Sequence, residues 1–389
     1  MIPETTANAK WRQSWRRFLR RGSFAAAIRL AGLVCVFALQ ILLARLIGDT
    51  AEYGKYAWGQ SLLFLLGAIA AIGLPLVTAR FVASLDARQN VAAARRVIAH
   101  ARQLLLRSTA LGPLAALLLW LAWRDDMGEG IYRSVSIVAL LFTPAVTFTL
   151  FYRDIARARQ WLGLALLPLQ VARPLLTAAL AGLFWWFFGS APGGTQTLLL
   201  AALSVLLVLL AQALVYQWRQ RRLPQTHAAV VSSVNQQSMA AAHATGNTRD
   251  LQLLATQSAH GSFWPTLLIS GFLMLFAAPL LQLFGREFAA ASPVLVILVA
   301  SSIVSVFAGP AHDLLVMTGR QKYIPRVMIF TAIGHVAALL LLLPFWGATG
   351  AACASLFSSV LGQGWLMLLA RRETGVGTTV LSGLRESRE

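Results

Sequence analysis

A single arginine inside a long apolar run is the residue with the clearest chemical potential in this sequence. Arg173 lies in the middle of the run 161–188, with Gln170 one helical turn before it and Pro174 directly after it. A helix rises about 1.5 Å per residue, so this position is far from both ends of the run. A charge among apolar residues is costly there, and it requires water, a polar partner or a ligand.

The chemistry that fits Arg173 is recognition of an anion. A guanidinium group can donate two parallel hydrogen bonds to phosphate or carboxylate oxygens. Gln170 would add an amide on the same helix face. The alternative is a structural role, in which Arg173 donates to carbonyl groups that Pro174 leaves without a helical donor. The residues favour the anion contact but leave both roles open.

Polar residues also occur in the first apolar run, 24–46. Arg29 lies near its start, Gln40 follows, and Arg45 closes it. If this run lines a cavity, Arg29 and Arg45 could pass an anion from one side to the other. Alternatively, Arg29 extends to the lipid headgroups, as long basic side chains often do. The predicted substrate-binding residues are therefore Arg29, Gln40, Arg45, Gln170 and Arg173.

The acidic residues exclude some functions. None of the 14 Asp and Glu residues falls in the middle of an apolar run. Proton relays and sodium sites in membrane proteins usually need a buried carboxylate, so a cation or drug pump is disfavoured. Cys35 and Cys353 lie in separate runs without metal-ligand spacing, and we find no catalytic triad or phosphate loop. We therefore expect no metal, no cofactor and no enzymatic activity.

Ten apolar runs carry these residues, and a helical membrane span needs about 20 apolar residues. The runs are 24–46, 56–79, 103–123, 132–152, 161–188, 196–217, 264–284, 288–311, 324–345 and 348–369. Since 58% of the residues are hydrophobic and 12% are charged, we predict an all-α integral membrane protein. The formal charge of +19 does not indicate a nucleic-acid partner, because the basic residues sit in short connections between the runs.

The basic residues predict the orientation of the chain. With the N-terminus inside, 26 of the 33 Lys and Arg residues fall on the cytoplasmic side and five fall outside. Both termini are then cytoplasmic, and the anionic leaflet supplies lipid partners. Arg16 and Arg17 precede the first run as in an export signal, but no small-residue cleavage site follows, so we expect the run to remain as a span.

The segment 218–262 is polar and interrupts the series of spans. An extra crossing here would turn Arg320, Lys322 and Arg326 outward, against the charge rule. We therefore predict a helix that does not cross the membrane, followed by a short surface helix at 250–259. The predicted domains are a basic tail 1–23, a six-helix lobe 24–218, a linker 219–262, a four-helix lobe 263–370 and a tail 371–389.

Several motifs resemble those of one transporter family. They are Leu43–Gly48, Glu52–Tyr56, Ile72–Val82, Pro279–Phe288 and Gly347–Ala352. Each motif is degenerate, but their order and spacing over most of the chain are more specific. By these motifs the chain resembles Wzx-type oligosaccharide flippases of the MOP superfamily, which have a MATE-like fold.

The resemblance implies two helical lobes around a cavity that opens to one side at a time. It implies a polyprenyl-pyrophosphate-linked oligosaccharide as substrate, in the bacterial inner membrane, for O-antigen, capsule or exopolysaccharide synthesis. It also implies polysaccharide polymerases and glycosyltransferases as partners, and basic residues lining the cavity. Arg29 fits that last role by position, and Arg173 does so less closely.

The family has two more spans between 218 and 262, where this chain retains only a polar remnant at 228–246. We therefore expect a MATE-like bundle of about ten spans with a truncated second lobe. Two other functions stay open: a non-transporting scaffold of a polysaccharide assembly complex, and a small-molecule antiporter.

Overall fold

The computed structural model describes residues 27–122, 133–159, 161–221, 248–318, 320–375 and 377–378. Helices are the only regular elements in these ranges, which confirms the predicted all-α class. The chain divides into two compact units, Met1–Val230 and Val231–Glu389. The predicted tail 1–23 and the predicted remnant helix 228–246 lie outside the described residues.

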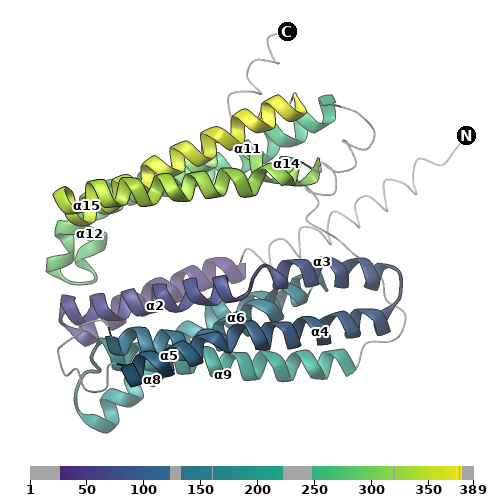
Figure 1. The fold of residues 1–389 in the computed structure, drawn as a ribbon. Coiled ribbons are helices and arrows are strands. Elements are labelled where there is room, and N and C mark those ends of the chain that lie inside the picture. Colours follow the sequence, from purple (N-terminus) through teal and green to yellow (C-terminus); the bar gives the residue numbers. More distant parts are fainter. Residues whose placement is uncertain are drawn as a thin grey trace, which may run out of the picture. The chain divides into compact units, whose positions relative to one another are not determined.

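The first unit is a bundle of long helices that run beside one another (Figure 1). Its elements are the helix Ala27–Ile47, α2 (Thr50–Ala70), α3 (Leu74–Ala87), α4 (Val91–Thr109), α5 (Leu111–Ala122), α6 (Arg133–Ala158), α7 (Leu162–Leu167), the π-helix η1 (Pro168–Ala172), α8 (Arg173–Phe188) and α9 (Gly194–Arg221). Helix α6 packs against α2, α3, α5 and α9, and Val135, Val146 and Phe151 on it are fully buried. It is therefore the centre of this unit.

Glycines allow α2 to approach α6 closely. Gly59 and Gly67 face Val135 and Val146, and a Cβ on Gly67 would lie 2.5 Å from Cγ1 of Val146. Thr147 of α6 also donates a hydrogen bond of 2.9 Å to the carbonyl of Gly67. Small residues at helix contacts are typical of membrane bundles, where van der Waals packing stabilises helix association.

The second predicted span is bent. Helices α2 and α3 meet at an angle of 51° across the turn 71–73. Gly73 has a φ of 70°, in the left-handed region that glycine adopts without a Cβ clash. Pro75 follows within the first turn of α3, where its missing N–H has no helical partner to lose. Local backbone chemistry thus explains the break.

The second unit contains α11 (Thr248–Leu275), α12 (Ala277–Gln282), the 3₁₀ helix η2 (Arg286–Ala291), α13 (Ser292–Phe307), α14 (Ala311–Met317), the 3₁₀ helix η3 (Gln321–Tyr323) and α15 (Ile324–Thr374). Helix α13 packs against α11 and α15. The predicted surface helix 250–259 is not separate from the span predicted to start at 264. Both belong to α11, which continues through Pro265 and across the predicted boundary between linker and lobe at 262–263.

Helix α15 reverses direction at Gly347, whose φ of 53° and ψ of −131° are not helical. Nδ1 of His335 lies 3.1 Å from Oγ of Ser358. The rings of Phe330 and Trp365 are 5.6 Å apart. The two halves therefore pack antiparallel, as Figure 1 shows, and they correspond to the predicted spans 324–345 and 348–369. His335 has the packing role that a lone histidine at mid-span indicates.

The membrane surface of the bundle is apolar. Six described helices are long and apolar enough to cross a membrane, or seven if α2 and α3 form one bent span. Each of the ten predicted spans falls on one to three of the helical elements, and breaks and the merged hairpin account for the lower count. Large apolar side chains such as Trp186 and Phe188 are exposed, as expected where lipid is the solvent.

The contact between α9 and α2 gives a stability prediction. Gly194 donates a hydrogen bond of 2.7 Å to Oε2 of Glu52, and a Cβ on it would collide with the Glu52 carbonyl oxygen. We expect Gly194→Ala to lower the free energy of unfolding by about 1–3 kcal/mol, because backbone must move. Gly182→Ala in α8 is the matched control, since nothing lies within 4 Å of its Cβ position. Equal thermal stability of both variants in detergent would contradict this packing.

Candidate anion-binding site

Arg173 begins α8 directly after the π-helix Pro168–Ala172. The N–H of Arg173 donates to the carbonyl of Pro168, five residues earlier. Pro168 and Pro174 both lack an N–H, so the ordinary helical hydrogen bonds are interrupted on either side. A single π-turn inside a helix is rare, and such turns are frequent at functional sites. The backbone around Arg173 is therefore irregular for a local, identifiable reason.

The Arg173 side chain is buried but not neutralised. Only 7% of the residue is exposed. Its guanidinium carbon lies 5.1 Å from the ring centre of Phe64 on α2, a cation–π contact. Its Nε is fully buried and has no hydrogen-bond acceptor, and no carboxylate of the described residues forms an ion pair with Arg173. A buried cation in this state is suited to receive an anion.

The structural alternative for Arg173 was to donate to carbonyls that proline leaves free. Pro168 leaves the carbonyl of Leu164 without its helical donor, and Gln212 of α9 supplies one, with Nε2 3.2 Å from that oxygen. Within the described ranges, Arg173 donates no side-chain hydrogen bond to a carbonyl. Gln212 therefore caps the carbonyl that Pro168 frees, whereas the carbonyl that Pro174 frees is that of Gln170, to which Arg173 donates no side-chain hydrogen bond.

A polar network on α2 lies beside Arg173. The Tyr53 hydroxyl donates to Oε1 of Gln40 at 2.9 Å, which joins α2 to the helix Ala27–Ile47. The buried Tyr56 hydroxyl donates to Oε1 of Gln60 and interacts electrostatically with Arg173. Because each hydroxyl uses its proton on an amide, its oxygen lone pairs remain available as acceptors. The network therefore presents an environment that favours a cation without neutralising its charge.

Gln170 is the second predicted residue that the structure brings to this region. It lies in the π-helix, against Gly32 of the first described helix, where a Cβ would lie 2.6 Å from Cβ of Gln170. Its Oε1 is fully buried without a donor. Unsatisfied buried polar atoms are rare in native proteins and often indicate water or a ligand. Gln40, Gln170 and Arg173 thus belong to one part of the first unit.

Arg29 and Arg45 lie elsewhere. They are separated by about four and a half turns of one helix, so they occupy opposite ends of it. Both are exposed. Arg29 is near enough to Arg157, in the last turn of α6, for electrostatic repulsion. The structure does not bring these two arginines together with Arg173.

The acidic side chains with assigned partners occupy helix ends. Asp86 pairs with Arg159 at 3.0 Å, and Asp154 pairs with Arg153 at 2.8 Å. Glu52, in the first turn of α2, pairs with Lys55, and Glu373 at the end of α15 pairs with Arg320. The region around Arg173 therefore has positive rather than negative character.

Most of the residues that surround Arg173 are not among the predicted site residues. Tyr53, Tyr56, Gln60 and Phe64 share one face of α2, as their spacing of three, four and four residues requires. That spacing is visible in the sequence. A stripe of hydroxyl, amide and ring groups along an otherwise apolar span is the signal that could have identified this face of α2.

Comparison with known proteins identifies a fold but no sequence family. No family model matches the chain, and no curated protein matches it. An inward-facing multidrug resistance MATE family transporter of the MOP superfamily superimposes with a TM-score of 0.67, at 15% identity, over 90% of this chain and 98% of that one. The chain has the MATE-like fold.

Two further structures with the MATE-like fold support this assignment. A MOP superfamily transporter from Pyrococcus furiosus gives a TM-score of 0.60 at 13% identity, over 90% of this chain and 94% of that one. An outward-facing multidrug resistance MATE transporter gives 0.59 at 16% identity, with the same coverage. The predicted fold class is confirmed. The predicted loss of two spans stays a prediction, because residues 222–247 lie outside the described ranges.

Proposed function

We propose that this chain is a flippase that moves a polyprenyl-pyrophosphate-linked oligosaccharide across the bacterial inner membrane by alternating access. In this proposal both termini are cytoplasmic, and the product feeds surface polysaccharide synthesis. The observation that carries it is Arg173, a buried guanidinium without a counter-ion among the described residues, set at a π-turn in a membrane helix. A guanidinium recognises phosphate oxygens through paired hydrogen bonds, and a pyrophosphate offers several of them.

The groups around Arg173 fit the different parts of such a substrate. The guanidinium would hold the pyrophosphate oxygens through two parallel hydrogen bonds. Gln40, Gln60 and Gln170 supply amides that can bind sugar hydroxyls. The lipid tail would stay in the bilayer, so transport requires only the polar head to cross.

The comparisons with solved structures support a transporter. The similar structures include inward-facing and outward-facing MATE transporters, the two states that alternating access requires. In the transporter from Pyrococcus furiosus, reverse polarity of the binding pocket suggests a different function. In this chain, a site of positive character around Arg173 would favour an anionic substrate over a cationic drug.

The test is complementation of a bacterial strain that lacks its oligosaccharide flippase. We expect the chain, expressed at normal abundance, to restore surface polysaccharide. A chain that inserts but never restores it, in strains covering several sugar types, would favour the scaffold of a polysaccharide assembly complex, with polymerase and glycosyltransferase partners.

Small-molecule antiport is the second candidate, because two of the similar structures are multidrug resistance transporters. Cation binding usually needs a carboxylate within the spans, and the sequence has none at the middle of an apolar run, which argues against antiport. Uptake of a cationic dye into vesicles, driven by a proton or sodium gradient, would establish antiport and refute the flippase proposal if polysaccharide were not restored.

A further inference from the structure

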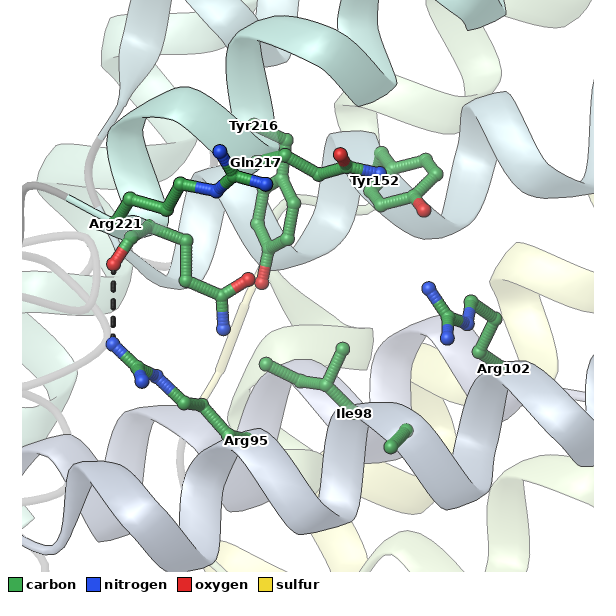
Figure 2. A pocket seen from close by; sticks show the side chains of 9 residues that line it. Arg95, Ile98, Arg102, Tyr152, Tyr216, Gln217 and Arg221 are labelled. Atoms are coloured by element: carbon green, nitrogen blue, oxygen red, sulfur yellow. Dashed lines mark hydrogen bonds between the residues drawn. The ribbon is translucent and has the colours of Figure 1, made fainter.

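A second basic site lies at one end of the first unit, away from Arg173. A groove of about 530 Å³ runs between α4, α6 and α9 (Figure 2). Arg95 and Arg102 of α4 line one side, and Arg221 at the end of α9 lines the other. The nine lining residues include no aspartate or glutamate. The groove is therefore cationic and has no acidic wall.

One of the three groove arginines is held by a hydrogen bond to the backbone, and the other two can bind a ligand. Nη2 of Arg95 donates a hydrogen bond of 3.2 Å to the carbonyl of Gln220, in the last turn of α9. This contact fixes the guanidinium across the groove, as the dashed line in Figure 2 shows. Arg102 and Arg221 are exposed and have no ion pair among the described residues. The donors of both side chains are therefore available to an anion in the groove.

The floor of the groove supplies a neutral donor. Tyr216 is 3% exposed and points from α9 toward α4 (Figure 2). Its hydroxyl oxygen accepts a hydrogen bond of 3.3 Å from Nη1 of Arg159, which is held by Asp86. Because the oxygen is already an acceptor, its own proton is left to be donated. Tyr216 is thus oriented by a buried ion pair to donate to a ligand.

The acidic side chain that affects Tyr216 does not oppose an anion. Asp86 affects Tyr216 electrostatically, but Arg159 neutralises it at 3.0 Å. The Arg159 side chain is 4% exposed and stacks on Trp161 and Tyr216. The local charge that a ligand meets therefore comes from the three groove arginines.

The size and place of the groove indicate the ligand class. Pockets of about 300–1,000 Å³ hold small organic ligands, so the space exceeds what a bare phosphate needs. The groove lies at the polar ends of membrane helices, where basic clusters meet anionic headgroups. We propose that Arg95, Arg102, Arg221 and Tyr216 bind a phosphate-bearing anionic lipid headgroup. This site is separate from Arg173 and does not depend on the flippase proposal.

Lipid binding to the purified full-length protein tests the proposal. Native mass spectrometry would titrate phosphatidylglycerol against phosphatidylcholine, and a separate arm would add inorganic phosphate or pyrophosphate. We expect phosphatidylglycerol to bind preferentially, and Arg102→Gln or Arg221→Gln to weaken that binding about tenfold, because a charge-assisted hydrogen bond is lost. Competition by millimolar free phosphate would support the phosphate site and assign a soluble anion as its ligand.

Arg96→Gln is the matched control, because Arg96 is an exposed arginine of α4 that does not line the groove. It removes the same charge and should change phosphatidylglycerol affinity less than about twofold. An equal loss in Arg96→Gln, or unchanged binding in both groove variants, would overturn the proposal, since only general charge attraction would remain.

Discussion

Replacement of Arg173 by glutamine is expected to lower transport of the lipid-linked oligosaccharide at least about 100-fold, because two charge-assisted hydrogen bonds to the pyrophosphate would be lost. Arg173→Lys keeps the charge but loses the planar fork, so an intermediate loss is expected. The measurement is restoration of surface polysaccharide in a flippase-deficient strain, with membrane abundance measured in parallel.

A measurement of thermal stability distinguishes a role of Arg173 in substrate binding from a structural role. The buried Nε of Arg173 has no acceptor, and Arg173 has no ion-pair partner in the described ranges. Its replacement therefore leaves no new unpaired charge, and thermal stability in detergent should be unchanged or higher. Arg29→Gln at the helix end is the control and should retain most transport. Full transport by Arg173→Gln at normal abundance would remove Arg173 from the mechanism.

The largest expected loss of stability is that of Arg159→Ala. Arg159 pairs with Asp86, donates to Tyr216 and stacks on Trp161, with its side chain 4% exposed. Removal of one partner from a buried pair costs about 3–5 kcal/mol, and the partial exposure of Asp86 places the expected loss near the lower value. Thermal or denaturant unfolding of the purified protein measures it.

Arg157→Ala is the matched control for Arg159→Ala, two residues earlier in the chain. The Arg157 side chain is 48% exposed and lies 3.5 Å from Asp154. An exposed pair of this kind contributes about 0–1 kcal/mol. Similar destabilisation by both variants would show that general charge loss, rather than the buried contacts of Arg159, accounts for the effect.

Much of the fold could be predicted because hydrophobic length is a strong signal in membranes. The ten apolar runs fall on helices, and Gly347, within a predicted motif, is the reversal point of α15. The break between α2 and α3 was harder to predict, because it depends on the local φ values of Ile72 and Gly73 rather than on composition. The continuity of α11 through Pro265 was also missed, since proline can be accommodated inside a membrane helix.

The arrangement of the candidate site could be predicted only in part. Arg173 and Gln170 were identified because a charge or amide within an apolar run is unusual. The π-turn was not, because Pro168 and Pro174 are visible in the sequence while the hydrogen-bond pattern between them is not. The groove of Arg95, Arg102 and Arg221 depends on helices more than 100 residues apart in sequence, joined by contacts such as that of Arg95 with Gln220. Such contacts cannot be derived from spacing alone.

Anion binding by Arg173 is tested most directly by an experimental structure with the polyprenyl-pyrophosphate oligosaccharide bound. We expect pyrophosphate oxygens about 3 Å from the guanidinium nitrogens of Arg173, beside Tyr56 and Gln170. A substrate bound elsewhere, with Arg173 still lacking any anion, would contradict it.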